Sequence, residues 1–596
     1  MKKETDIITP EQAGTLSALF AERLRRTPQA CAYRRFDLQG RCCDACITWE
    51  ATAALAGRWQ AALRRDGLLP GDRVAVMLRN SLEWAVFDQA ALGLGLVTVP
   101  LFVNDRPDNF ATIIEETGAR FLLIEGVPQW EMIQSVQARL DSLIRIVALT
   151  PACSGICDPR LIEVGDWLPA GEVEYDAGVA TADNLATIVF TSGTTGHPKG
   201  VMLTHANIIA NAYAGLSRVP IYPDDLFLSF LPLSHTLERT AGYYLAIMAG
   251  ACVAHVRSLE KLADDLPVVR PTVVVAVPRV FERIHTRLLA KLAIAPPWQQ
   301  QLFTLTVDVG WQRFLYQQGR GRWSLRFLLW PLLQRLIANK VLKALGGRLR
   351  LAISGGAPLS PEVARIFIAL GLPLLQGYGL TETSPVVAVN AEADNHPETV
   401  GPPLPGVAIK IAGTGELLIK GASVMAGYWQ NPAATTAIID KEGWLHSGDL
   451  ATVSATGHIT ISGRLKEIIV LSSGEKVPPT DIELAITADP LFEQVLVVGE
   501  GRPYLAALVV LNPEEWERVA SAGNIGADAS TVEAFLLARI AARIAGFPGY
   551  ARIRRVQVTA LPWDVANGLM TPTLKLRRPQ LLSHFAAEIN ELYAGH

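Results

Sequence analysis

The chain has 596 residues and a mass of 64.5 kDa, more than one hydrophobic core usually supports, so we expect two or more domains. A hydrophobic content of 50% with 19% charged residues excludes a largely disordered chain. The net charge of −3 gives no overall electrostatic basis for binding nucleic acid, and no apolar run approaches the roughly 20 residues of a membrane-spanning helix.

The beginning of the sequence and its cysteines indicate a cytoplasmic protein. The first ten residues lack the apolar core of a signal peptide. Seven cysteines, an odd number, do not suggest a disulfide framework. Cys42, Cys43 and Cys46 have no histidine or second cysteine pair nearby to complete four metal ligands, so we expect ordinary thiols there.

The first part of the chain alternates helices with short apolar strands. Apolar residues recur at helical spacing over 16–26, 49–65, 81–94 and 109–117, and short apolar runs that predict strands fill 73–78, 97–102 and 121–124. This alternation predicts an α/β fold of doubly wound sheets covered by helices on both faces.

The stretch 191–200 follows an expected strand at 185–190 and precedes an expected helix at 206–215. Gly193, Gly196 and Gly200 allow successive backbone N–H groups to point at one anion. The side-chain donors are the hydroxyls of Thr191, Ser192, Thr194 and Thr195 and the ammonium of Lys199. Pro198 precedes Lys199 and a glycine follows it, so the stretch fails the Walker A pattern. Taken alone, it is either a phosphate-binding loop or a flexible turn.

The segment 281–345 is mostly helical in pattern. Between 313 and 350 it carries arginines and lysines without an acidic residue, interleaved with tryptophan, phenylalanine and leucine. Such a basic amphipathic stretch is a candidate for peripheral contact with an anionic membrane. The alternative is that its apolar side packs on the protein and its cations are solvated or bind a polyanionic ligand.

Strands dominate after residue 405, at 408–411, 416–420, 458–462 and 468–471. A second α+β unit is expected to begin near Arg464, with helices at 478–488 and 532–544 and strands at 495–498 and 506–511. We therefore expect a β-subdomain followed by a small C-terminal domain.

Four further motifs carry polar groups suited to a nucleotide. In 376–384, Tyr378 can stack on a base and Glu382 can hold Mg²⁺. In 443–449, Asp449 can accept hydrogen bonds from ribose hydroxyls. The other two motifs are Gly-Arg-Leu-Lys-Glu at 463–467 and the stretch 569–578 around Lys575. Each one alone is more often a turn or a solvated charged face than a binding motif; their joint presence in this order is more specific.

With these motifs the sequence resembles the adenylate-forming acyl-CoA synthetase superfamily, and within it most resembles bacterial long-chain fatty acyl-CoA synthetases. The likeness extends from about residue 15 to 590 and includes the gating segment 231–239 and the helical insertion at about 284–346. It implies a large N-terminal AMP-binding domain (1–463) and a small mobile α+β C-terminal domain (464–596).

The resemblance implies roles for particular residues. Lys575 is the catalytic lysine, with Arg577 and Arg578 as flanking alternatives, and Glu382 and Lys199 assist it. His235 is either the gate near the acyl carboxylate or a structural histidine, and Leu465 and Lys466 form the hinge. The remaining ATP- and AMP-binding positions are Thr191, Ser192, Gly193, Thr194, Thr195, Gly196, Gly355, Gly356, Ala357, Gln376, Gly377, Tyr378, Gly379, Thr381, Asp449 and Arg464.

The implied reaction is activation of a long-chain fatty acid with Mg-ATP to an acyl-adenylate, followed by thioester formation with coenzyme A. An ordinary lysine pKa of about 10.4 would keep Lys575 cationic for the first step. The alternatives are a fatty acyl-AMP ligase that delivers to a carrier protein, a CoA ligase for a shorter or aryl acid, an acyl-AMP-oxidising luciferase, and a non-catalytic binding module. No sequence feature favours the last two.

Overall fold

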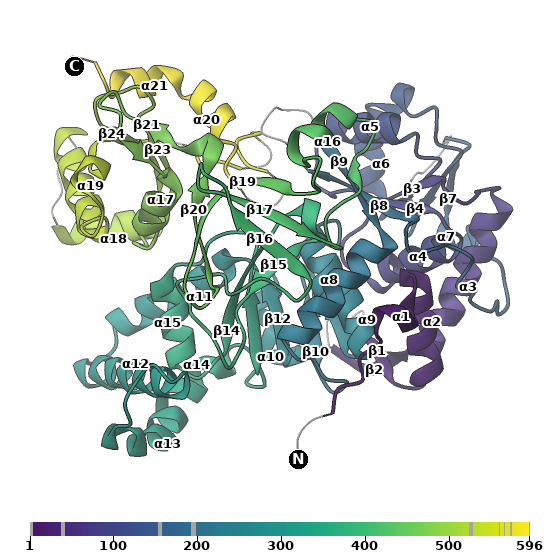
Figure 1. The fold of residues 1–596 in the computed structure, drawn as a ribbon, viewed down its shortest axis with the longest axis horizontal. Helices are drawn as coiled ribbons and strands as arrows, with labels where there is room; N and C mark the ends of the chain where they lie inside the picture. Colours follow the sequence, from purple (N-terminus) through teal and green to yellow (C-terminus); the bar gives the residue numbers. More distant parts are fainter. Residues whose placement is uncertain are drawn as a thin grey trace.

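The computed structural model describes residues 4–36, 42–152, 158–191, 198–523, 529–559, 561–564, 567–571 and 575–594 (Figure 1). Two eight-stranded sheets form the body of the molecule, and a smaller unit containing the C-terminal strands and helices sits beside them.

The first large sheet is parallel in its middle and antiparallel at both edges. Its strand order is β15-β14-β13-β12-β10-β11-β1-β2. The strands are β1 (Cys31–Phe36), β2 (Cys42–Thr48), β10 (Leu226–Ser229), β11 (Cys252–His255), β12 (Val273–Ala276), β13 (Leu351–Ser354), β14 (Leu374–Gly379) and β15 (Val386–Val389).

The second large sheet has the order β18-β9-β8-β4-β3-β5-β6-β7, parallel except for the pairs that β9 makes. The strands are β3 (Arg73–Met77), β4 (Val97–Pro100), β5 (Phe121–Ile124), β6 (Arg145–Ala148), β7 (Leu161–Glu163), β8 (Leu185–Thr191), β9 (Lys199–Thr204) and β18 (Gly427–Tyr428).

Helices separate and cover the two sheets. One core cluster contains Val76 and Val201 from one sheet, Phe227 from the other, and Leu19 and Phe87 from helices between them. The predicted doubly wound α/β arrangement is therefore confirmed. These helices are α1 (Pro10–Ala13), α2 (Leu16–Arg26), α3 (Trp49–Arg65), α4 (Leu82–Gly93), α5 (Pro107–Thr117), α6 (Val127–Gln134), α7 (Val164–Trp167), α8 (His205–Arg218), α9 (Leu245–Ala249) and α10 (Leu262–Val269).

The basic segment forms a helical projection with its own small core around Phe303, Val309 and Trp330 (Figure 1). Its helices are α11 (Pro278–Ala293), α12 (Pro297–Gln317), α13 (Trp330–Leu333) and α14 (Asn339–Lys343), and α12 packs on α15 (Pro361–Ala369).

A four-stranded antiparallel sheet and helix α16 (Pro432–Ile438) form the β-subdomain. Its strands are β16 (Val407–Ile411), β17 (Glu416–Gly421), β19 (Leu445–Val453) and β20 (Ile459–Arg464). The chain then enters the C-terminal unit, which buries two apolar clusters of its own. That unit contains β21 (Ile469–Val470), β22 (Lys476–Val477), α17 (Pro479–Thr487), β23 (Phe492–Val498), β24 (Leu505–Leu511), α18 (Pro513–Gly523), α19 (Ala529–Arg543), β25 (Ile553–Val558), α20 (Arg578–His584) and α21 (Ala586–Glu591).

One expectation about the cysteines is wrong. Cys31 and Cys46 form a disulfide between the antiparallel strands β1 and β2. The strand pairing brings their Cα atoms to 5.3 Å, a separation typical of disulfides. Sequence spacing alone does not reveal this pairing, because it depends on the register of the two strands.

Within the described residues, no helix combines the length and the hydropathy needed to cross a bilayer.

Candidate active site

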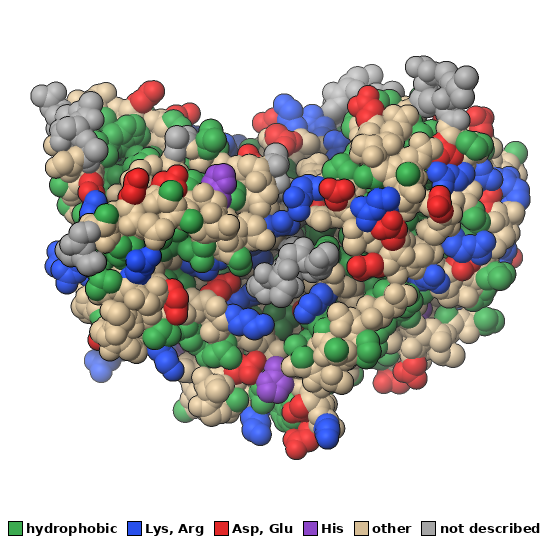
Figure 2. Space-filling model, turned by 90° about the horizontal axis from the view of Figure 1, so that it is seen from above, with side chains coloured by type: hydrophobic (Ala, Val, Ile, Leu, Met, Phe, Trp, Pro, Cys, Tyr) green, Lys and Arg blue, Asp and Glu red, His purple; other side chains and the backbone are tan. Residues whose placement is uncertain are grey.

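A cleft of about 2130 Å³ lies where the large sheets, the β-subdomain and the C-terminal unit meet. Its lining includes Lys199, Tyr378, Glu382, Asp449, Arg464 and Lys575. In the face seen in Figure 2, lysine and arginine side chains gather around the hollow beside the C-terminal unit. The structure thus brings motifs far apart in the sequence to one cleft, which both cationic and anionic side chains line.

The two ends of the predicted phosphate loop are paired strands. Thr191 ends β8 and lies opposite Lys199, which begins β9. Ser192, Gly193, Thr194, Thr195 and Gly196 lie outside the described residues. At Gly200 a Cβ atom would approach Ile188 Cγ2 to 2.8 Å, so close packing of the hairpin requires glycine there.

The expected strand, loop and helix sequence is wrong at this point. Strand β9 intervenes between the loop and α8, because the apolar residues Val201 and Leu203 turn into the core and pair with β8. The segment 191–200 therefore joins two antiparallel strands and does not lead directly into a helix N-terminus.

Tyr378, Asp449 and Arg464 form a polar cluster on β14, β19 and β20. The hydroxyl of Tyr378 donates a hydrogen bond of 2.5 Å to Asp449 Oδ2, and Arg464 Nε lies 3.2 Å from Asp449 Oδ1. Burial raises the pKa of the Asp449 carboxyl, while the guanidinium of Arg464 and the Tyr378 hydrogen bond oppose that rise. A buried acceptor held in place by two donors is suited to ribose hydroxyls.

Glu382 lies in a short 3₁₀ turn, Thr381–Thr383, at the end of β14. Tyr428 donates a hydrogen bond of 2.7 Å to Glu382 Oε1, and Lys199 Nζ lies 5.1 Å from the centre of the Tyr428 ring. Tyr428 thus connects the predicted metal-binding carboxylate with the predicted phosphate lysine. Sequence reasoning missed Tyr428, because its position depends on the two-residue strand β18 pairing with β9.

Lys575 projects into the cleft from the C-terminal unit, where its side chain remains accessible to solvent between the cleft walls. Reduced hydration there lowers the pKa of its ammonium, and the Arg464 guanidinium lowers it further, whereas Asp449 and Glu382 raise it. The assumption of an ordinary lysine pKa is therefore wrong. Of the two flanking arginines, Arg578 is bound to Glu483 at 2.6 and 2.8 Å inside the C-terminal unit.

The predicted ATP- and AMP-binding residues that follow β13 and those of β14 border the same cleft. Gly355, Gly356 and Ala357 follow β13, and Gly356 adopts a positive φ of 82°. The Gln376 side chain is hydrogen-bonded to the backbone: its Oε1 accepts a hydrogen bond of 2.7 Å from Leu359 N, and its Nε2 donates one of 3.3 Å to Thr399 O. Gly377 lines the cleft, and at Gly379 a Cβ atom would come within 2.0 Å of Pro385 O, so the backbone turn there requires glycine.

His235 faces the cleft near Lys575. Burial lowers the pKa of His235 to about 4, and the charge of Lys575 adds to that shift. The imidazole is therefore neutral at physiological pH, and its Nδ1 accepts a hydrogen bond of 3.2 Å from Leu237 N.

Glu238 is a second titratable group of this segment, which sequence reasoning did not single out. It is 1% exposed, and burial raises its pKa to about 8 while Ser229 donates a hydrogen bond that opposes the rise. Gly242 leaves room for it, since a Cβ atom there would lie 2.6 Å from Glu238 Oε1.

This burial predicts a pH-dependent contribution to stability. The unfolded chain releases the Glu238 proton above about pH 4.5, while the folded protein retains it to about pH 8, so the stabilisation present below pH 4.5 is lost as the pH rises. The free energy of unfolding of Glu238→Gln should therefore rise relative to that of wild type by about 1.4 kcal/mol for each pH unit between about pH 4.5 and pH 8. Urea unfolding at several pH values measures this. The exposed Glu514→Gln serves as a control, and wild-type and Glu238→Gln stabilities that vary in parallel with pH would contradict the assignment.

The predicted hinge residues follow β20 directly. Leu465 and Lys466 lie in a 3₁₀ turn, Leu465–Glu467, and the Leu465 side chain is exposed. This turn is the connection between the β-subdomain and the C-terminal unit.

The chain matches known families over almost its whole length. Residues 20–429 match the AMP-binding enzyme family, and residues 466–596 match the AMP-binding enzyme C-terminal domain. It is 31% identical to the long-chain-fatty-acid–CoA ligase FadD15 of Mycobacterium bovis, with 99% of each chain covered. It is 29% identical to the long-chain-fatty-acid–[acyl-carrier-protein] ligase AEE15, chloroplastic, of Arabidopsis thaliana, covering 89% of this chain and 80% of that one.

Solved structures agree on the fold. The adenylation domain of a carboxylate reductase from Mycobacterium chelonae superposes with a TM-score of 0.75 at 24% identity, covering 97% of this chain and 91% of that chain. With matching family models over both of its parts, the chain belongs to the AMP-binding enzyme family.

Proposed function

We propose that the protein is an AMP-forming long-chain fatty acid–CoA ligase. It activates a fatty acid with ATP to an acyl-adenylate and transfers the acyl group to coenzyme A. The observation that carries this proposal is the meeting of Lys575, from the C-terminal unit, with Glu382 and Asp449 in one cleft. Similarity over the full length to a long-chain-fatty-acid–CoA ligase supports the substrate class.

In the first half-reaction a carboxylate attacks the α-phosphate and pyrophosphate leaves. Two anions must approach each other, and we assign Lys575 to hold both of them. Lys199 and the donors of 191–200 would bind the departing phosphates. Tyr378 would stack on adenine, and Asp449 with Arg464 would hold the ribose, with Gly355, Gly356 and Ala357 beside the base.

A magnesium ion fits the donor set at Glu382. One carboxylate that faces a phosphate-sized cavity is the usual protein share of a Mg²⁺ site, the remaining ligands being phosphate oxygens and water. When bound, the ion would neutralise phosphate charge. The Tyr428 hydroxyl orients the Glu382 carboxylate toward this role.

The second half-reaction needs the space that Lys575 occupies. We propose that residues 464–596 form a mobile domain that swings away from residues 1–463 about Leu465 and Lys466, admitting the thiol of coenzyme A. The exposed single turn between the two units supports this hinge position.

An apolar branch of the cleft supports a long acyl substrate. Besides His235 the lining includes apolar side chains on or near α8 to α11, among them Val219, Phe227, Leu245, Leu262, Leu266 and Ile284. We assign this branch to the acyl chain and His235 to its entrance. Burial of a saturated chain there would favour binding by about 0.8 kcal/mol for each CH₂ group removed from water.

The identity of the acyl acceptor is tested by supplying coenzyme A and holo-acyl carrier protein in separate assays. With palmitate and ATP, coenzyme A should yield the thioester, whereas holo-acyl carrier protein should not. The reverse preference would identify a ligase of the kind represented by the chloroplast relative.

We also propose peripheral contact with anionic membrane through the helical projection. Around α13 it exposes Trp323, Leu325, Leu328 and Leu332, which are between 55% and 72% exposed. Arg322, Arg326 and Arg335 are exposed among them. Apolar side chains beside cations are suited to the interface of an anionic bilayer.

Arg320, although part of the basic stretch, is engaged elsewhere, since it contacts Asn395 and His396. The informative change is therefore the triple replacement of Leu325, Leu328 and Leu332 by serine. In a flotation assay with phosphatidylglycerol liposomes, the wild-type protein should float with the vesicles. The membrane-bound fraction of the triple variant should be lower by at least about tenfold. A variant with Leu69, an exposed leucine remote in the chain, changed to serine is the control. Equal flotation of the wild type and the triple variant would contradict the proposal.

A further inference from the structure

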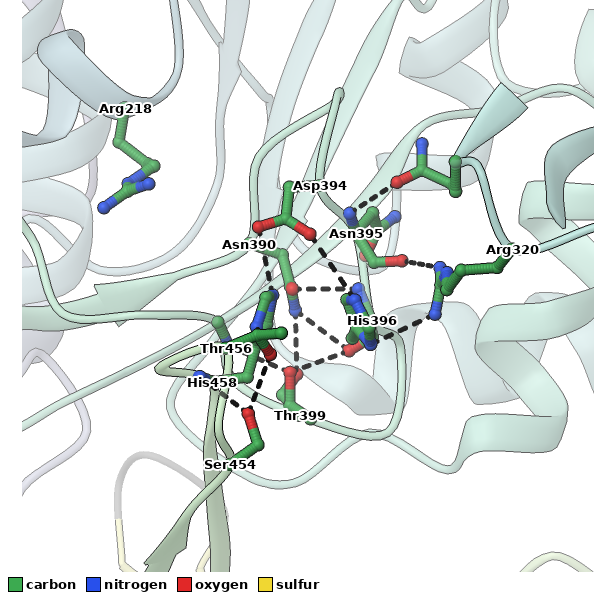
Figure 3. A network of polar contacts seen from close by, with 12 residues as sticks. Arg218, Arg320, Asn390, Asp394, Asn395, His396, Thr399, Ser454, Thr456 and His458 are labelled. Atoms are coloured by element: carbon green, nitrogen blue, oxygen red, sulfur yellow. Dashed lines mark hydrogen bonds and ion pairs between the residues drawn. The ribbon is translucent and has the colours of Figure 1, made fainter. Parts of the chain in front are cut away.

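Three metal-ligating side chains meet outside the active-site cleft. Asp394 and His396 lie in the loop that follows β15, and His458 immediately precedes β20. One ligand atom from each lies within 4.8 Å of the others. Figure 3 shows the Asp394 carboxylate between the two imidazoles, in contact with both. The cluster therefore joins the β-subdomain to a loop of the first large sheet.

The separations match those within a metal's coordination shell. Asp394 Oδ1 lies 3.4 Å from His396 Nε2, and Asp394 Oδ2 lies 3.4 Å from His458 Nε2. Two ligands bound tetrahedrally to one Zn²⁺ at about 2.0–2.1 Å are about 3.3–3.4 Å apart. One ligand atom from each of the three side chains lies within 4.8 Å of the other two, so side-chain movement of about an ångström would let them face one ion.

His458 supplies an independent indication of a ligand. Its side chain is 1% exposed, and its buried Nε2 makes no hydrogen bond of good geometry to a described residue, although Asp394 Oδ2 lies 3.4 Å away. Buried ring nitrogens without hydrogen bonds are costly and require an explanation. The other ring nitrogen, Nδ1, lies 3.0 Å from Thr456 Oγ1. With its proton on Nδ1 and donated to Thr456, His458 presents the Nε2 lone pair toward Asp394.

The surroundings of His396 can orient its imidazole. The carboxylate of Glu398 lies 3.5 Å from His396 Nδ1 and can accept its proton when Nε2 is a ligand. Arg320 Nη1 now lies 3.1 Å from the same nitrogen and 3.9 Å from Glu398, so metal binding would move its hydrogen bond to Glu398.

We propose that Asp394, His396 and His458 form a site for one divalent transition-metal ion, for which Zn²⁺ is the best match. Two imidazoles and one carboxylate are ligands that Zn²⁺ prefers, and the solvent-facing side, where Asp394 is 53% exposed, leaves room for water as the fourth ligand. None of the three residues lines the active-site cleft.

The ion would link two parts of the protein rigidly to each other. The loop that carries Asp394 and His396 is bound to β14, since Asn390 N donates to Gln376 O at 3.0 Å. On the other side, His458 begins the strand that ends at Arg464 and the hinge. Zn²⁺ would thus fix the strand preceding the hinge to the strand that carries Tyr378, without taking part in the reaction.

The test is Zn²⁺ binding to the full-length, chelator-treated protein without nucleotide, followed by equilibrium dialysis and elemental analysis. Wild type should bind one Zn²⁺ at this site, with a raised Tm, and Co²⁺ in its place should give the intense visible bands of tetrahedral coordination. His396→Gln and Asp394→Asn alter side chains with solvent contact, so both variants should fold. Each variant should fail to bind the one Zn²⁺ ion that the wild type binds at this site.

Two further variants sharpen the result. Glu398→Gln removes only the partner of His396 and should weaken Zn²⁺ binding by about 10- to 100-fold. His584→Gln changes an exposed histidine elsewhere and should bind as wild type does. No Zn²⁺ binding by wild type, or equal stoichiometry and affinity in His396→Gln and Asp394→Asn, would overturn the proposal.

Discussion

Replacement of Lys575 by alanine should lower adenylate formation by at least about 10²- to 10³-fold, because the variant lacks the cation that holds the attacking carboxylate against the α-phosphate. Thioester formation from supplied acyl-adenylate should largely survive, since in the proposed domain movement that step follows the departure of Lys575 from the cleft. The charges of Asp449 and Glu382 raise the pKa of Lys575, and we assign this arrangement to the first step.

Pyrophosphate exchange measures the first half-reaction, and acyl-CoA formation from purified acyl-adenylate measures the second. Lys476→Ala, an exposed lysine of the same unit, controls for the loss of a positive charge. Equal loss of both half-reactions in Lys575→Ala would mean that the lysine serves the fold or both steps, and would contradict the assigned role.

Replacement of Glu382 by glutamine should lower pyrophosphate exchange by about 10²-fold at ordinary Mg²⁺ concentrations, with partial recovery as Mg²⁺ is raised. The amide keeps the shape of the side chain but removes the charge that binds the ion. Tyr428→Phe is the matched control, because it removes the 2.7 Å hydrogen bond and leaves the carboxylate in place.

The Tyr428→Phe variant should therefore lose less activity than Glu382→Gln and should not depend more strongly on Mg²⁺. If Glu382→Gln shows the same Mg²⁺ dependence as wild type, the carboxylate has a role other than metal binding.

Four strands of the second large sheet, β3, β4, β5 and β8, could be predicted because fully buried parallel strands are short, almost wholly apolar runs, whereas no strand of the first large sheet was assigned from the sequence. Leu185–Thr191 and Phe121–Ile124 are examples, and both lie in the sheet as expected. Strand β9 was missed because Lys199 and Gly200, read as the end of a phosphate loop, conceal the apolar alternation that follows them.

Contacts between distant segments could not be read from the chain. The cluster of Asp394, His396 and His458 requires the β19–β20 hairpin to approach the loop after β15, and nothing in the local sequence signals that approach. Likewise, Tyr428 reaches Glu382 only through the pairing of β18 with β9. Motifs predicted residues that the fold brings to one cleft, whereas their partners and their pKa shifts depend on the packing around them.

The most direct test of the proposed function is pyrophosphate release measured across carboxylic acids from acetate to oleate, with and without coenzyme A. A long-chain ligase should turn over fastest with the long acids, and sustained release should require coenzyme A, with acyl-CoA and AMP formed in equal amounts. Fastest turnover with acetate or an aryl acid, or sustained release that coenzyme A does not stimulate, would contradict it.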